Sequence, residues 1–217
     1  MQSFCGILYA NKNSAESAES AVNTVSRMDD AGAEAVCIAA WPSAWSAISD
    51  ALINAGHWSS RIYWRDFTQP CSFWRAVSEC EWFAGGRACL IARADEEFDV
   101  DLWPLANRFA DNDWKGCVVA LAPHEKADVR VARKADLSRS SSPTRWIERF
   151  SSMPTANAKF VSGDHLLTGV GIYDGQLWDV LGRMNSVQLQ DDLSVPHAYL
   201  HDRSLDFLEI NAGYKRV

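Results

Sequence analysis

The first 94 residues alternate short apolar runs with longer segments in which apolar residues recur at helical spacing. Short apolar runs are typical of buried strands, and the longer segments are typical of amphipathic helices. This alternation predicts a parallel sheet covered by helices on both faces, because a helix must carry the chain back between parallel strands. The expected strands are 3–10, 34–40, 61–65 and 87–94, and the expected helices are 14–31, 43–55 and 70–83.

The second half of the chain departs from this alternation and predicts a mixed sheet with antiparallel strands. The expected strands are 115–123, 127–134, 144–150, 166–174 and 205–210, and the expected helices are 101–110 and 175–184. The polar segment 138–143 (SRSSSP) is a turn, too short to link two domains. We therefore expect one three-layer α/β/α domain with a mixed, mostly parallel central sheet.

The composition is typical of a globular protein without a membrane span. Of the 217 residues, 47% are hydrophobic and 23% are charged, and no run approaches the roughly 20 apolar residues that cross a bilayer. The N-terminus lacks the basic region of a signal peptide, so we expect a cytoplasmic protein that does not bind membranes. The formal net charge of −7 repels a nucleic-acid backbone, which argues against a nucleic-acid partner.

The cysteine and histidine residues do not form a recognisable metal motif. No CxxC pair occurs among the six cysteines, and we expect buried thiols at the four that lie in apolar runs, Cys5, Cys37, Cys89 and Cys117. His197 and His201 have the i, i+4 spacing of a helical zinc pair. They follow Pro196 in a segment that reads as extended, so we expect a surface or core role for both.

Five segments are informative through their sequences and through their order along the chain. They are 67–80 (FTQPCSFWRAVSEC), 85–105 (GGRACLIARADEEFDVDLWPL), 146–149 (WIER), 167–174 (LTGVGIYD) and 207–217 (FLEINAGYKRV). In this order they resemble the sugar-1-phosphate nucleotidyltransferases over nearly the whole chain. The resemblance implies a Rossmann-like, GT-A-like fold, with a nucleotide-binding half at 1–112 and a sugar-binding half at 113–217.

The resemblance implies a reaction that needs a metal ion. In that family a nucleotidyl group passes from a nucleoside triphosphate to a sugar 1-phosphate, with Mg²⁺, to give a nucleotide sugar and pyrophosphate. Asp95 takes the position of the metal-binding aspartate, at the strand end where open α/β sheets bind ligands, and Glu209 replaces the second one. The alternatives are a turn or helix-capping acid for Asp95 and a surface strand residue for Glu209.

The resemblance also gives candidates for phosphate and sugar contacts. Arg149 stands where the family has a lysine, and Gly169 would let a sugar approach the backbone. The candidate residues are Lys12 and Arg149 for catalysis, Asn13, Glu148 and Gly169 for substrate binding, and Asp95 and Glu209 for the metal.

The first loop departs from the family pattern. The family's G-x-G-[TS]-R would fall near residues 11–17, where this chain has NKNSAES. Asn13 followed by Glu16 predicts a capping box, in which both side chains occupy the N–H groups that would otherwise bind phosphate. Glu16 and Glu19 add negative charge beside Lys12, the one local positive charge. This helix is therefore expected to be capped rather than open to a triphosphate.

Three interpretations remain open. The first is an enzyme that uses an atypical first loop to act on a nucleoside triphosphate and a sugar phosphate. The second is a degenerate homologue that binds a nucleotide sugar, or a non-catalytic partner subunit. The third is an unrelated α/β domain, since fold does not fix function. The 11% of aromatic residues would also suit the interface of a homo-oligomer.

Overall fold

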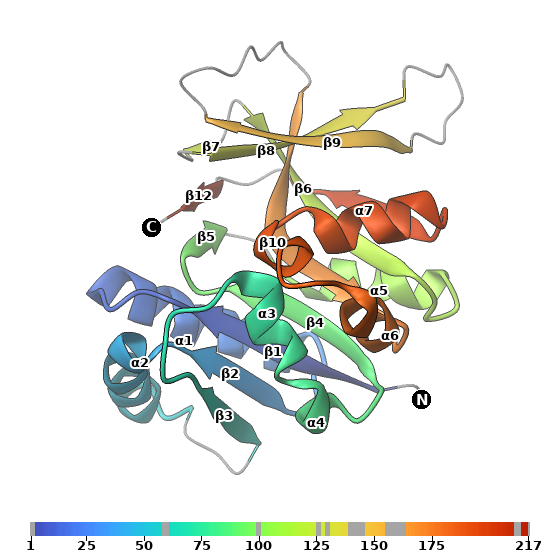
Figure 1. Ribbon diagram of the computed structural model, residues 1–217. Coiled ribbons are helices and arrows are strands. Elements are labelled where there is room, and N and C mark those ends of the chain that lie inside the picture. Colours follow the sequence, from blue (N-terminus) through green and yellow to red (C-terminus); the bar gives the residue numbers. More distant parts are fainter. Residues whose placement is uncertain are drawn as a thin grey trace.

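The computed structural model describes residues 3–57, 61–98, 101–124, 127–128, 131–138, 146–154, 164–210 and 214–216 (Figure 1). A twisted main sheet has the strand order β11-β6-β10-β4-β1-β2-β3. On this path only β10 runs antiparallel to its neighbours, so the expected mixed, mostly parallel sheet is confirmed. The strands are β1 (Phe4–Ala10), β2 (Val36–Ala40), β3 (Ile62–Asp66), β4 (Ala88–Arg93), β6 (Cys117–Pro123), β10 (His165–Tyr173) and β11 (Leu205–Glu209).

Helices cover both faces of this sheet, because its central strands carry apolar side chains on both faces (Figure 1). Leu8 of β1 belongs to one buried core and the preceding Ile7 to the other. The first core lies under α1 (Ala15–Asp30), α2 (Pro42–Asn54) and α5 (Trp103–Asp111). The second lies under α3 (Phe73–Ser78), α4 (Glu81–Ala84), α6 (Leu177–Arg183) and α7 (Ser194–His201).

The other strands lie outside this path, in a hairpin at the top of Figure 1 and in a small sheet at its left. The hairpin of β8 (Val131–Leu137) and β9 (Ile147–Pro154) joins the sheet through pairing of β8 with β10. A second sheet contains β5 (Glu96–Phe98), β12 (Tyr214–Arg216) and β7 (Ala127–Asp128). The short helix η3 (Gln188–Gln190) precedes α7.

Several expected elements differ from the observed ones. The single helix expected at 70–83 is two short helices, because the backbone leaves helical geometry at Cys80 (φ −98°, ψ 5°) before α4 begins. Gly85 then ends α4 in the left-handed conformation that glycine favours. The segment around His197 and His201 was expected to be extended and is the helix α7. Of the turn expected at 138–143, residues 139–143 lie outside the described residues.

The cysteines are free thiols, and five of the six are buried in the core. This confirms the expectation of buried thiols at Cys5, Cys37, Cys89 and Cys117. Within the described ranges, no helix is both long enough and apolar enough to cross a lipid bilayer.

Candidate functional site

The carboxyl ends of β4 and its neighbours form the edge at which open α/β sheets bind their ligands. Asp95 lies there, two residues beyond the end of β4, and its side chain is almost completely buried. The guanidinium of Arg93, the last residue of β4, covers it. Arg93 Nε donates to Asp95 Oδ1 at 3.0 Å and Nη2 donates to Oδ2 at 3.4 Å. Both carboxylate oxygens of Asp95 are therefore hydrogen-bonded to one buried cation.

This ion pair belongs to a larger charge cluster formed by Arg93, Asp95, Glu96, Arg133 and Asp192. Arg93 Nε also lies 3.3 Å from Glu96 Oε1, and Arg93 Nη1 lies 3.0 Å from Asp192 Oδ2. Arg133, on β8, donates to Glu96 Oε1 and lies 3.6 Å from Asp192 Oδ2. Three carboxylates and two guanidinium groups thus join β4, β8 and the segment before α7.

Gly169, in the middle of β10, is required for this packing. Its backbone N–H donates to Glu96 Oε2. A Cβ at this position would lie 2.6 Å from Glu96 Oε2 and 2.8 Å from Arg93 Cγ, both too short for ordinary contact. The space beside Gly169 that would suit a sugar is filled by the charge cluster.

The surroundings keep Arg93 positively charged. Burial alone would lower its pKa, but the carboxylates of Glu96, Asp95 and Asp192 more than offset that effect and raise it above the usual range. The guanidinium also lies 5.0 Å from the ring of Phe73 and 5.5 Å from that of Tyr9. Such contacts add cation–π attraction. Arg93 is a permanent cation at the end of β4.

The structure gives Glu209 and Asp95 different partners. Glu209 ends β11, and β6 and β10 lie between β11 and β4. Three strand spacings put these two strands roughly 14 Å apart. The Glu209 carboxylate lies 3.4 Å from Nε2 of His165.

These donors do not suit Mg²⁺. A magnesium ion needs ligand oxygens at about 2.1 Å, whereas both oxygens of Asp95 face a guanidinium that would repel it. Within the described part of the chain, no group of three or more Asp, Glu, His or Cys side chains could hold a metal ion.

The first loop is exposed at Lys12 and Asn13. The expected capping box of Asn13 and Glu16 is wrong by one residue, because α1 begins at Ala15 and Ser14 is its N-cap. Ser14 has extended backbone angles, and its Oγ accepts a hydrogen bond from the N–H of Ser17 at 3.1 Å. The helix start is thus capped, as expected, but by a different side chain.

Glu148 and Arg149 lie on β9, and both side chains are exposed. Arg149 Nη2 lies 2.8 Å from Oδ2 of Asp136 on β8, and the Arg149 side chain is 73% exposed. This cross-strand pair stabilises the hairpin weakly, since exposed ion pairs contribute little.

An open groove of about 570 Å³ lies beyond the carboxyl ends of β2 and β3. Trp41 directly follows β2, and residues 70–72 lie between β3 and α3. Tyr9 of β1 donates its hydroxyl to the carbonyl of Cys71 at 2.7 Å. The residues that line the groove are Trp41, Pro70, Cys71, Ser72, Arg75, Ser186, Leu189 and Gln190. Trp41 and Arg75 are not among the residues expected from the sequence, although Trp41 is a candidate by position alone, because it directly follows a parallel strand.

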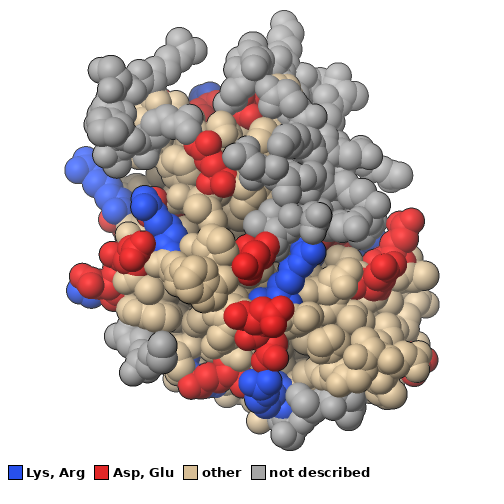
Figure 2. Space-filling model, turned by 180° about the vertical axis from the view of Figure 1, so that it is seen from behind, with Lys and Arg blue, Asp and Glu red and all other residues tan. Residues whose placement is uncertain are grey.

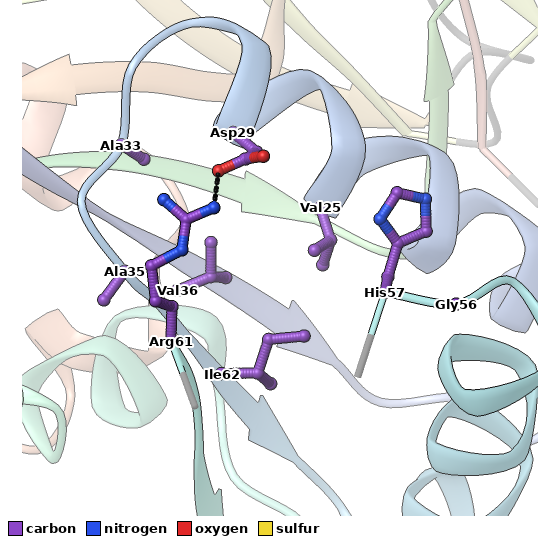
Figure 3. Close-up of a pocket in the computed structure, with 9 residues that line it drawn as sticks. All are labelled: Val25, Asp29, Ala33, Ala35, Val36, Gly56, His57, Arg61 and Ile62. Carbon is purple, nitrogen blue, oxygen red and sulfur yellow. Dashed lines mark hydrogen bonds and ion pairs between the residues drawn. The ribbon is translucent and has the colours of Figure 1, made fainter. Parts of the chain in front are cut away.

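A second pocket lies at the opposite edge of the sheet (Figure 3). It is lined by the first residues of β2 and β3, Val36 and Ile62, and by the ends of α1 and α2. The Arg61 guanidinium crosses it to reach Asp29 at 2.7 Å. Its volume of about 180 Å³ is below the usual range of ligand pockets, roughly 300 to 1,000 Å³.

No protein-family model and no curated protein matches the sequence. Solved structures do match. A putative glucose-1-phosphate thymidylyltransferase from Bacillus anthracis, in complex with sucrose, is similar with a TM-score of 0.77 and 15% identity, over 99% of this chain and 89% of that one. A UTP-bound UGPase from Acinetobacter baumannii has a TM-score of 0.73 and 12% identity, over 98% and 88%.

A UDP-glucose pyrophosphorylase complexed with UDP-glucose is similar with a TM-score of 0.66 and 11% identity, over 98% of this chain and 92% of that one. The TM-scores establish the architecture. At identities this low, the chemistry must be argued from the residues of the site. The chain has the fold of the sugar-1-phosphate nucleotidyltransferases.

Proposed function

We propose that this protein binds a nucleotide or a nucleotide sugar in the groove at the carboxyl edge of β2 and β3, without transferring a nucleotidyl group. Transfer from a triphosphate to a sugar phosphate brings two anions together, and it requires cations that are free to contact both. The binding groove is open, whereas the end of β4 is filled by the ion pair of Arg93 and Asp95.

The observation that carries this proposal is the ion pair of Arg93 with Asp95. Arg93 holds Asp95 through both carboxylate oxygens and is itself shared with Glu96 and Asp192. A guanidinium fixed by three carboxylates has little positive charge left for a phosphate, and it takes the place of the metal ion beside Asp95.

The groove has the size and the groups for a nucleotide. Its volume of about 570 Å³ lies within the usual range for small-molecule sites. Trp41 is partly buried and lines the groove, and in this proposal a base stacks on its indole. Arg75, which pairs with Glu79, and Ser72, whose hydroxyl donates to the carbonyl of Leu189, add polar groups to the wall. Two proteins of this fold were crystallised with UTP and with UDP-glucose.

The test compares ligand binding with turnover. The purified protein is heated with each of the four nucleoside triphosphates and with UDP- and dTDP-glucose, in Mg²⁺ and in EDTA. A ligand at about one hundred times its dissociation constant adds roughly 2.7 kcal/mol to the free energy of unfolding. We expect one nucleotide or nucleotide sugar to raise Tm equally in both buffers. Pyrophosphate release from a triphosphate and a sugar 1-phosphate should stay at background.

A matched pair of tryptophan variants locates the ligand. Trp41→Ala should abolish the ligand-dependent rise in Tm, whereas Trp103→Ala should preserve it, since Trp103 is exposed and lies on α5, on the other face of the sheet. Pyrophosphate release that depends on Mg²⁺ would show instead that the protein is a nucleotidyltransferase, with Asp95 as a metal ligand. No shift with any of these compounds would exclude both binding and transfer.

A further inference from the structure

Strand β3 forms one edge of the main sheet, and among the described strands it pairs only with β2. The carbonyl of Arg61 accepts the N–H of Val36 at 2.9 Å, and the N–H of Phe67 donates to Ala40 at 3.3 Å. In a parallel ladder, alternate residues bond to the same neighbour. The odd-numbered residues of β3 therefore face β2, while Ile62 and Asp66 direct their N–H and C=O groups away from it.

Aromatic side chains flank this edge on both faces of the sheet. On one face Trp64 contacts Trp45 of α2, with 5.6 Å between ring centroids, and Trp45 is 40% exposed. On the other face Tyr63 is 43% exposed and lies 5.2 Å from the ring of Phe83. Natural edge strands are commonly protected by charged side chains, especially lysine, or by proline. Strand β3 (IYWRD) has neither lysine nor proline, and its two charged residues, Arg65 and Asp66, have opposite signs.

We propose that β3 pairs antiparallel with β3 of a second copy of this chain, on a two-fold axis that passes beside Trp64. In this register Ile62 of each copy lies opposite Asp66 of the other. Both residues direct their backbone groups outward, so each of these pairs forms two N–H···O bonds. The main sheet then continues from one copy into the next.

The side chains suit this register. Tyr63 lies opposite Arg65 of the other copy, a pairing that allows cation–π contact. The two Trp64 side chains meet at the axis, each beside its own Trp45, and like charges do not lie opposite one another in the strand. A second copy thus supplies a matching aromatic and hydrogen-bonding edge without any further partner.

The surface beside β3 carries little of the net charge of −7 that would oppose self-association. Helix α2, which packs next to β3, has one charged residue, Asp50. Figure 2 shows the face covered by α1, α2 and α5, and its lower right, where α2 lies, is mostly uncharged. Homodimer interfaces favour such surfaces.

Sedimentation velocity over a wide range of protein concentration measures the association. We expect a species of twice the 24.2 kDa chain mass at high concentration. Asp66→Pro removes an N–H that faces away from β2 and leaves the β2–β3 bonds in place, so it should weaken association about thirtyfold. Asp66→Ala removes the same carboxylate but keeps the N–H, and it should associate like the unmodified protein.

Amide hydrogen exchange provides a second readout that needs no variant. The amides of Ile62 and Asp66 should become protected as concentration rises, whereas those of Tyr63 and Arg65, which face β2, should be protected at every concentration. A monomer at all concentrations would overturn the proposal. So would a dimer that Asp66→Pro leaves intact, or exchange at Ile62 and Asp66 that does not change with concentration.

Discussion

The guanidinium of Arg93 donates to both carboxylate oxygens of Asp95, and neither side chain reaches solvent. A buried carboxylate without its cation is costly, because desolvation of the charge is no longer compensated. Asp95 therefore contributes to folding through Arg93, whatever else it contacts.

Replacing Asp95 with asparagine should destabilise the protein by about 3 kcal/mol, the lower end of the range for breaking a buried pair, since Arg93 keeps Glu96 and Asp192. The control is Asp136→Asn, which breaks the exposed pair with Arg149 and should cost less than about 1 kcal/mol. Urea denaturation without added metal measures the unfolding free energy of both variants. The midpoints report the loss of stability when the slope m is the same as in the unmodified protein.

A loss for Asp95→Asn no larger than for Asp136→Asn would contradict this role. It would indicate instead that Asp95 is kept for a ligand, as its position at the end of β4 predicts for a metal-binding carboxylate.

Gly169→Ala should cost about 1 to 3 kcal/mol, because the added methyl group meets Glu96 and Arg93 in a filled space. Gly182→Ala is the matched control. Gly182 lies in α6 with nothing within 4 Å of an added Cβ, so alanine there should stabilise the protein by up to about 1 kcal/mol. Thermal unfolding of both variants checks the two signs, and equal effects would show that the space beside Gly169 is open.

The central strands were predictable because their runs are apolar on both faces. The strand expected at 3–10 is β1 at Phe4–Ala10, and that expected at 87–94 is β4 at Ala88–Arg93. The position of β10 between β4 and β6 was not predictable, because strand pairing over such distances in the chain leaves no local signal. The helix α7 was not predicted, because the segment around Pro196 reads as extended. Pro196 lies in the first turn of the helix, where proline is tolerated.

The charge cluster could be predicted only in part. Arg93 stands at the end of an apolar run, and a buried arginine needs a carboxylate partner, so Asp95 and Glu96 were available from the sequence. Asp192 is 99 residues away from Arg93, and Arg133 is 37 residues from Glu96. Only the fold brings these residues together. The sequence alone therefore could not show that the end of β4 is filled.

Ser14→Ala should destabilise the protein by about 1 kcal/mol, because the Ser14 hydroxyl caps α1 through the N–H of Ser17. Asn13→Ala is the control and should change stability by less than about 0.5 kcal/mol, since Asn13 is exposed and lies one residue before the cap. Chemical denaturation of the two variants shows which of the two residues caps α1. A larger loss of stability for Asn13→Ala would show that Asn13 is the cap, as the sequence predicts.

Asp206 on β11 makes stability depend on pH. Burial alone would raise its pKa, but hydrogen bonds from Arg108 and Asn112 more than offset this and hold it below its ordinary 3.8. The unfolded chain then binds a proton at this group before the folded one does. The stabilisation is therefore fully present above about pH 4 and is lost as pH falls through the lower pKa of the folded state.

The difference in unfolding free energy between the unmodified protein and Asp206→Asn isolates this group from the other acids. It should be about 1 kcal/mol at neutral pH, a value kept small because Arg108 is half exposed, and it should shrink towards zero in acid. In an Arg108→Gln background the same difference should be smaller and should depend less on pH, because the main donor is gone. A difference that stays constant from neutral pH to about pH 2 would show that Asp206 owes its contribution to packing rather than to charge.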